Sequence, residues 1–232
     1  MLLQLDYLLF ALPGILLSLW AQSRISSAYA AASRIPASSG LMGAEAAQGI
    51  MQAAGVSGVA IEPVAGQLTD HYDPRHKVLR LSEEVYGGHS LAALGIAAHE
   101  AGHAIQDASH YPGLVVRNAI VPLAGLGSTV FWILIIAGLV LGMFRLILLG
   151  IILFSLTVVF QLINLPVEFD ASRRARRMLL ATGMVAPQED EVVGQVLNAA
   201  AWTYVAATLT SVLSLLYYLY AFGLLGGHRS DD

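Results

Sequence analysis

Residues 97–108 read AAHEAGHAIQDA, which places two histidines and a glutamate among small alanines in a strongly apolar chain. If this stretch is helical, His99 and His103 are one turn apart on the same face, so both imidazoles can bind one cation. Glu100 then projects beside them and can polarise a water molecule bound to that cation. The spacing is HExxH, which is typical of zinc-dependent hydrolysis.

A competing interpretation is a helix whose histidines only cap it or hydrogen-bond locally. Burial of two unpaired imidazoles and a carboxylate costs several kcal/mol, which favours metal binding. The chain contains no cysteine, so thiolate ligands and disulfides are excluded. A transition-metal site must therefore draw its ligands from the seven histidines and sixteen acidic residues.

The composition is that of a membrane protein. Of the 232 residues, 56% are hydrophobic and 12% are charged, and the mean hydropathy is +0.67, which is too apolar for an ordinary soluble domain. Residues 2–20 read as an anchor that stays in the mature protein, and residues 119–165 as two spans joined by a tight turn near Gly142 and Met143. Residues 199–225 form the last span before a short tail that ends at residue 232, with Tyr217, Tyr218 and Tyr220 placed as interfacial aromatics would be.

The basic residues predict the orientation. Ten of the twelve lie between the first and second spans or between the third and fourth: Arg24, Arg34, Arg75, Lys77, Arg80, Arg117, Arg173, Arg174, Arg176 and Arg177. Arg145 and Arg229 lie on the other side. The positive-inside bias puts residues 21–118 and 166–198 in the cytosol and both termini outside. The formal net charge of −4 gives no support for a nucleic-acid partner.

A third metal ligand must come from another cytosolic segment, since a catalytic zinc ion usually has three protein ligands and one position for water. Glu168 and Asp170, in NLPVEFDASRR just after the third span, meet this demand best. They are two residues apart, so on a continuous helix only one is expected to bind the metal. We favour Glu168 and keep Asp170 as the alternative. A carboxylate paired with Arg173 or Arg174 is the interpretation without a metal.

The first cytosolic segment, residues 21–118, reads as a small mixed domain. Gly43 to Ala54 has helical spacing and ends at Gly55, a typical C-terminal cap. VAIEP, QLTDHY and KVLRLS then alternate with turn residues like short strands. Ser90 can cap the helix that carries HExxH, which stops near Tyr111.

Four stretches in order resemble the YugP-like family of bacterial membrane zinc metallopeptidases: Gly43-Ala44-Glu45, LTDHYDPRHKVLRLS, AAHEAGHAIQDA and NLPVEFDASRRA. The resemblance covers most of the chain. It implies a neutral zinc peptidase embedded in the plasma membrane, with His99 and His103 as ligands of one zinc ion and Glu100 as general base. More distantly, HExxH with a later EFxA segment is similar to the HtpX and CAAX prenyl protease group, which implies that Glu168 is the third ligand.

One departure from that group concerns the support of the metal. The group usually has an aspartate four residues after the ligand, where this chain has Ser172. Asp170 is the candidate that takes over this support. Asp107 lies one turn after His103 and is a second candidate for orienting an imidazole, with a solvated helix end as the alternative.

Two further groups have a functional and a plain interpretation. The first group consists of Asp70, His71, Tyr72 and His76. These residues could supply a transition-state hydrogen bond or line a substrate groove, although a polar turn uses the same residue types. The second group consists of Arg173, Arg174, Arg176 and Arg177. It is most simply an anchor to anionic lipid headgroups.

The sequence therefore predicts an α-helical multi-pass membrane protein of about four transmembrane helices with a small cytosolic α+β zincin-like metallopeptidase domain. Its substrates would be peptides or membrane proteins, cleaved at the cytosolic face of the bacterial plasma membrane. An intramembrane site-two-type protease is the nearest rival, echoed by Asn164, Pro166 and Asp170, although Ser172 and Arg173 replace the glycines expected there. A metal transporter is a second alternative, and it would need ionisable residues inside the spans. A catalytically inactive scaffold is a third, and it would bind no zinc.

Overall fold

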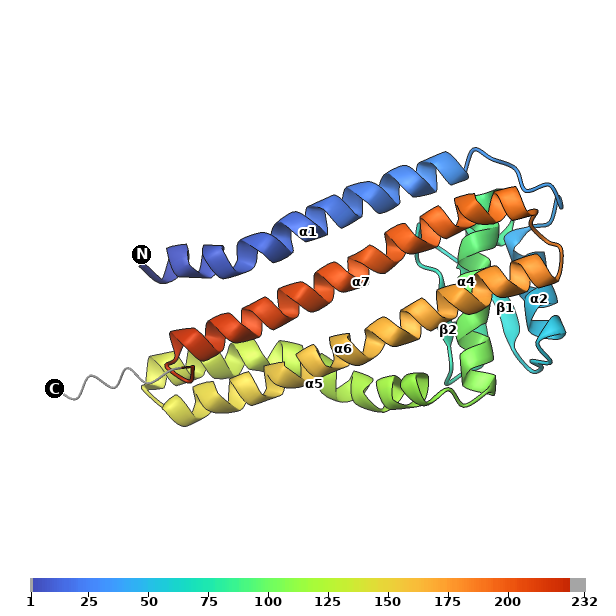
Figure 1. The fold of residues 1–232 in the computed structure, drawn as a ribbon. Coiled ribbons are helices and arrows are strands. Elements are labelled where there is room, and N and C mark those ends of the chain that lie inside the picture. Colours follow the sequence, from blue (N-terminus) through green and yellow to red (C-terminus); the bar gives the residue numbers. More distant parts are fainter. Residues whose placement is uncertain (1, 226–232) are drawn as a thin grey trace. The chain divides into compact units, whose positions relative to one another are not determined.

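The computed structural model describes residues 2–225, so Arg229 and the rest of the tail lie outside the described residues. Its helices are α1 (Leu2–Ala32), α2 (Gly43–Ala53), α3 (Glu83–Tyr86), α4 (Leu91–Ala108), α5 (Pro112–Leu141), α6 (Phe144–Ala181) and α7 (Pro187–Ala221). Its strands are β1 (Ala60–Val64), β2 (His71–Asp73) and β3 (Val78–Ser82). Figure 1 shows these elements along the chain.

Four of the helices, α1, α5, α6 and α7, are long and apolar enough to cross a membrane. α5 ends at Leu141 and α6 begins at Phe144, with Gly142 at a φ of +64° in the turn between them, as the apolar pattern predicts. The helices run further than the predicted spans. α1 continues past residue 20 to Ala32, and α6 continues through Pro166 to Ala181. Apolar content marks where a span lies but not where its helix ends.

The described residues fall into two compact units. The helical unit contains the described parts of Met1–Trp20, Val116–Leu165 and Thr203–Asp232. The mixed unit contains Ala21–Val115 and Pro166–Trp202. The HExxH helix and the segment that begins at Pro166 therefore belong to the same unit.

Aromatic rings form much of the core of the helical unit. The ring centroid of Phe131 lies 4.8 Å from that of Phe154 and 4.8 Å from that of Tyr218. Tyr217 contacts Tyr7 edge to face with a centroid distance of 5.0 Å. Tyr217 and Tyr218 are buried within the helical unit, and their predicted place at a membrane interface stays a prediction. Their rings contribute apolar area to helix packing, and among the three tyrosines only Tyr220 is exposed.

The mixed unit contains a three-stranded sheet in the order β1-β3-β2. β1 pairs with β3 in parallel, and β2 pairs with β3 in antiparallel orientation. The expected strand over QLTDHY is shorter than predicted, because β2 begins at His71 and the preceding residues form a turn. Successive side chains of a strand point to opposite faces of the sheet. In β3, Leu79 and Leu81 on one face are buried, and so are Val78 and Ser82 on the other. The central strand is thus covered on both faces.

Local signals define the helices of the mixed unit as the sequence predicts. α2 ends just before Gly55, which has a φ of +72° that favours glycine. The Ser90 hydroxyl accepts a hydrogen bond of 3.2 Å from the Ala93 backbone N–H and caps α4. α4 packs against α2, α3, β2 and β3. Its small and apolar residues are buried in the main core, so α4 is the element around which this unit is built.

α4 also approaches the part of α6 that belongs to the mixed unit very closely. A Cβ atom at Gly102 would lie 2.7 Å from the carbonyl oxygen of Ala171 and 3.2 Å from its carbonyl carbon. Backbone atoms cannot move aside as a side chain can, so glycine is required for this approach.

We therefore predict that Gly102→Ala separates α4 from α6 and destabilises the protein by about 1–3 kcal/mol, the usual cost of overpacking. Gly95→Ala is the matched control on the same helix, because the nearest atom to its new Cβ is Cγ1 of the Val193 side chain at 3.1 Å. Thermal unfolding of the two variants measures the difference. Equal stability of both variants would show that the contact with Ala171 is not restrictive.

Candidate metal centre

Three side chains meet between α4 and α6 in the mixed unit. His99, His103 and Glu168 each offer one ligand atom, and these atoms lie within 4.8 Å of one another. Oε2 of Glu168 is 3.2 Å from Nε2 of His99 and 3.5 Å from Nε2 of His103. A tetrahedral ion with bonds of about 2.0–2.2 Å separates its ligand atoms by about 3.3–3.6 Å. The donor set suits zinc, and the two distances from Glu168 to the histidines are close to this range.

The other ring nitrogens of the two histidines have partners of their own. Nδ1 of His99 lies 3.1 Å from Oγ of Ser172, and Nδ1 of His103 lies 2.9 Å from Oε1 of Gln106. Both contacts leave Nε2 directed at Glu168. Partners of this kind fix the ring orientation of a metal-binding histidine.

Gln106 also decides the tautomer of His103. Its side chain is fully buried, and its Nε2 donates to the carbonyl oxygen of Val167 at 2.8 Å and to Oδ2 of Asp170 at 2.9 Å. The amide oxygen must therefore face His103, where it accepts a hydrogen from Nδ1. This leaves the lone pair of Nε2 available for a metal ion.

Asp170 does not join the cluster. Its Oδ2 accepts from Arg174 Nε at 2.5 Å, and its Oδ1 accepts from Arg173 at 3.3 Å. The interpretation of a carboxylate paired with arginine thus applies to Asp170, whereas Glu168 lies with the two histidines. Asp170 supports His103 through Gln106, and Ser172 itself contacts His99 in place of the aspartate of the related group.

Glu100 lies on the same helix as the two histidines, and its residue is 9% exposed. Its Oε2 accepts a hydrogen bond of 3.1 Å from the backbone N–H of Tyr72 in β2. The carboxylate is thus held beside the cluster by a group from the sheet rather than by a charged partner.

The negative charges around His103 alter its titration. Burial by itself lowers the pKa of His103, but the hydrogen bond and charge of Glu168, with a smaller contribution from Glu100, outweigh burial and raise the pKa above its ordinary value. The same negative potential that favours a proton on His103 favours a metal cation at this point.

The structure also defines the roles of Asp107 and of two arginines. Asp107 does not orient His103; its Oδ2 accepts from the Tyr72 hydroxyl at 2.6 Å, and the residue that orients His103 is Gln106. Two of the four arginines predicted to anchor lipid headgroups, Arg174 and Arg176, pair with Asp170 and Asp190, and the anchoring role itself stays a prediction. Their guanidinium groups therefore contribute to the fold of the mixed unit.

The residues of LTDHYDPRH separate into different roles. Asp70 accepts hydrogen bonds from the backbone and hydroxyl of Ser82, and His71 contacts the carbonyl oxygen of Thr69. His76 contacts Asp73 within the turn after β2. Tyr72 is the member of this group that contacts Glu100, and it does so through its backbone N–H.

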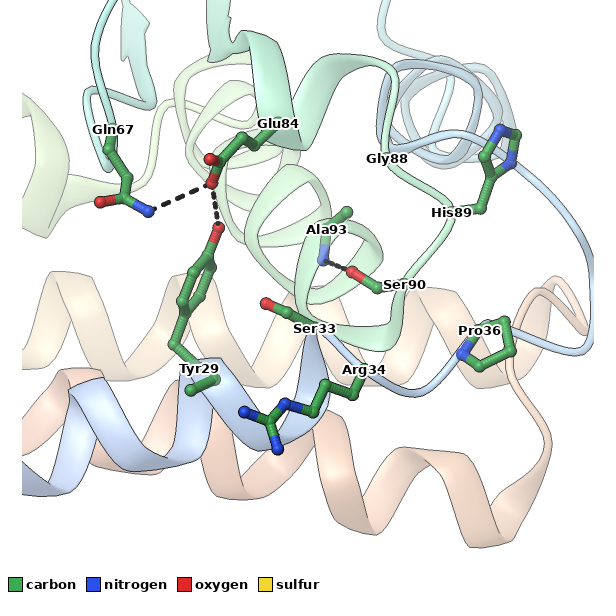
Figure 2. Close-up of a pocket in the computed structure, with 11 residues that line it drawn as sticks. Tyr29, Ser33, Arg34, Pro36, Gln67, Glu84, Gly88, His89, Ser90 and Ala93 are labelled. Atoms are coloured by element: carbon green, nitrogen blue, oxygen red, sulfur yellow. Dashed lines mark hydrogen bonds between the residues drawn. The ribbon is translucent and has the colours of Figure 1, made fainter.

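A cavity of about 730 Å³ lies at the N-terminal end of α4 (Figure 2). Oε2 of Glu84 there accepts hydrogen bonds from the Tyr29 hydroxyl at 3.1 Å and from Gln67 at 3.2 Å. The lining of this cavity includes Ala93 of α4. Ala93 precedes Glu100 by seven residues, which is close to two helical turns, so both residues lie on nearly the same face of α4. The cavity shares no residue with the His–His–Glu cluster but lies on the face of α4 that carries Glu100.

Comparison with known proteins decides the family. Residues 7–223 match the family described as "Putative neutral zinc metallopeptidase". The chain belongs to this family. A relative from Bacillus subtilis (strain 168), named "Putative membrane protease YugP", is 48% identical to the chain over 206 residues, which cover 89% of this chain and 92% of that protein. No solved structure matches the chain at a significant level. The resemblance to the YugP-like family is thereby confirmed.

If Gln106 holds His103 as the structure shows, Gln106→Ala should weaken zinc binding by about 10- to 100-fold, the usual effect of removing such a partner. Ser109→Ala is a suitable control, because the Ser109 hydroxyl only bonds backbone carbonyls at the end of the same helix. Competition with a chelator of known affinity measures both variants. An unchanged affinity in Gln106→Ala would mean that His103 needs no such partner.

Proposed function

We propose that the protein is a zinc metalloendopeptidase of the bacterial plasma membrane whose active site faces the cytosol. The observation that carries the proposal is the convergence of His99, His103 and Glu168, with Glu100 beside them, in a chain of the neutral zinc metallopeptidase family. Two imidazoles and one carboxylate are a donor set used by catalytic zinc sites. The apolar helices and the name of the Bacillus subtilis relative support a membrane location.

In this mechanism His99, His103 and Glu168 would hold one zinc ion. When bound, zinc supplies Lewis acidity that polarises the scissile carbonyl and lowers the pKa of the attacking water. Glu100 takes a proton from that water and later delivers it to the leaving amine. Gln106 and Ser172 keep the two imidazoles in position, and Glu168 supplies the negative charge of the ligand set.

The cytosolic orientation rests on charge distribution. Ten of the twelve basic residues lie in the two segments that include the HExxH helix and the sequence after Pro166, and such segments stay on the cytosolic side of a bacterial membrane. The proposed site draws its residues from both segments. The substrate is accordingly a peptide or a membrane protein with a cytosolic cleavage site.

The rival functions have less support. A site-two-type protease would need Asp170 as a metal ligand, but its carboxylate binds Arg173, Arg174 and Gln106. A transporter would need ligands within the apolar spans, whereas the described cluster lies in the mixed unit. Measurements of zinc content and of turnover distinguish an inactive scaffold from an active peptidase.

The first test removes the proposed base. Glu100→Gln keeps the size and one hydrogen-bond acceptor of the side chain but cannot take a proton, so turnover should fall by about 10²- to 10⁴-fold while zinc stays bound. Cleavage of a quenched fluorescent peptide and metal analysis of the same purified full chain give both values. Turnover at the wild-type rate would remove Glu100 from the mechanism.

The second test separates the two candidate third ligands. Glu168→Ala should abolish stoichiometric zinc binding and activity, whereas Asp170→Ala should retain zinc and lose affinity only through Gln106. Metal analysis after dialysis against a weak chelator distinguishes the two variants. Zinc retained in Glu168→Ala but lost in Asp170→Ala would overturn the ligand assignment and favour the site-two-type protease.

A further inference from the structure

The carboxylate of Glu100 is held by a strand rather than by its own helix. The backbone N–H that binds its Oε2 belongs to Tyr72, the middle residue of β2, which lies opposite Leu79 of β3. Since β2 is at the edge of the sheet, a backbone N–H that points away from β3 can bind a group outside the sheet. The position of the proposed base therefore depends on where β2 lies relative to α4.

The side chain of Tyr72 fixes β2 to α4 at a second point. Its hydroxyl donates a hydrogen bond of 2.6 Å to Oδ2 of Asp107. Asp107 follows Glu100 by seven residues, which is about 10.5 Å along the helix and close to two full turns, so both lie on one face. One tyrosine thus bridges two points of this face, with its backbone at Glu100 and its phenol at Asp107. Burial and the bond to Asp107 raise the pKa of Tyr72, so the phenol stays a donor.

The turn after β2 brings a third group to the same place. Lys77 has a φ of +54°, and its ammonium group pairs with the Oδ2 atom of Asp107 that Tyr72 also contacts. Within the turn, Asp73 Oδ1 accepts from the backbone N–H groups of Arg75 and His76 at 3.0 and 3.3 Å. The hydrogen bond from His76 lowers the pKa of Asp73, which keeps this turn-stabilising carboxylate charged. A short edge strand is weak alone, and these contacts hold it in one place.

We propose that Tyr72 and Asp107 are positioning residues that hold β2 against α4 and thereby set the carboxylate of Glu100 for proton transfer. This inference rests on the proposed function. Asp107 contacts Tyr72 and Lys77 and not the candidate metal ligands, so loss of its contact with Tyr72 should affect the base and leave the ligand set intact. A displacement of about 1 Å in a reacting group can cost 10²-fold in rate, which makes such a contact matter.

The test compares Tyr72→Phe and Asp107→Ala in the zinc-loaded full chain in detergent. Each variant removes the hydrogen bond between the phenol and Asp107, and Asp107→Ala also removes the ion pair with Lys77. Each variant should therefore lower kcat by about 10- to 100-fold. KM for a quenched fluorescent peptide should stay within about twofold, and zinc content should stay at the wild-type value. Asp107→Asn keeps an acceptor for the phenol and should recover most of kcat. The double variant should be no worse than Asp107→Ala alone, because the two residues share the hydrogen bond.

Arg75→Ala is the matched control, because Arg75 lies in the same turn with an exposed side chain and should keep the wild-type kcat. Wild-type kcat in both Tyr72→Phe and Asp107→Ala overturns the inference. Loss of zinc in these variants also overturns it, since the contact would then support the fold around the metal and not the base. If Tyr72→Phe does not fold, Asp107→Ala and its comparison with Asp107→Asn decide.

The failure of this inference is distinct from the failure of the proposed function. If Glu100→Gln is inactive and the two positioning variants are fully active, Glu100 is the base and the contact with β2 is dispensable. If Glu100→Gln keeps the wild-type rate, the proposed mechanism fails and the positioning role fails with it.

Discussion

The contact between α4 and α6 within the mixed unit is the constraint on which the site depends. Gly102 stands between His99 and His103 in the sequence, and its missing side chain lets the backbone of Ala171 come within van der Waals distance. Glu168 lies about one helical turn before Ala171 on α6 and so reaches the histidines. A larger residue in the middle of HExxH would separate the two helices at the point where the ligand atoms meet.

This close approach brings polar groups into a buried region, where each needs a partner. The two helices supply these partners to each other. Gln106 of α4 contacts His103, the Val167 carbonyl oxygen and Asp170, and Ser172 of α6 contacts His99. Asp170 in turn is neutralised by Arg173 and Arg174. The consequence is that Glu168 is the carboxylate of α6 left to face the two imidazoles.

The parts of the structure that depend on local periodicity and on residue type could be predicted from the sequence. Apolar runs identified the four long helices, Ser90 and Gly55 marked helix ends, and HExxH placed two histidines on one face of α4. Contacts that depend on how separate elements pack against each other could not be predicted in this way. The role of Gln106 is invisible in sequence because an amide beside HExxH has no characteristic spacing, and Asp107 was the more conspicuous neighbour. The burial of Tyr218 likewise depends on Phe131, and that of Tyr217 on Tyr7 and Phe10, all of which are distant in the chain.

The groups that contact the histidines also set the charge of the proposed site. Both Nδ1 atoms face neutral partners, the hydroxyl of Ser172 and the amide of Gln106, and the aspartate of the related group is absent at residue 172. A zinc ion held by two neutral imidazoles and one carboxylate keeps a net positive charge of about one, and neutral partners do not reduce it further. Tyr72 binds Glu100 through a backbone N–H and brings no opposite formal charge to that carboxylate. In the proposed mechanism this arrangement would leave a bound zinc ion with a positive charge next to the proposed base, Glu100, and such a separation of charge favours activation of a water molecule.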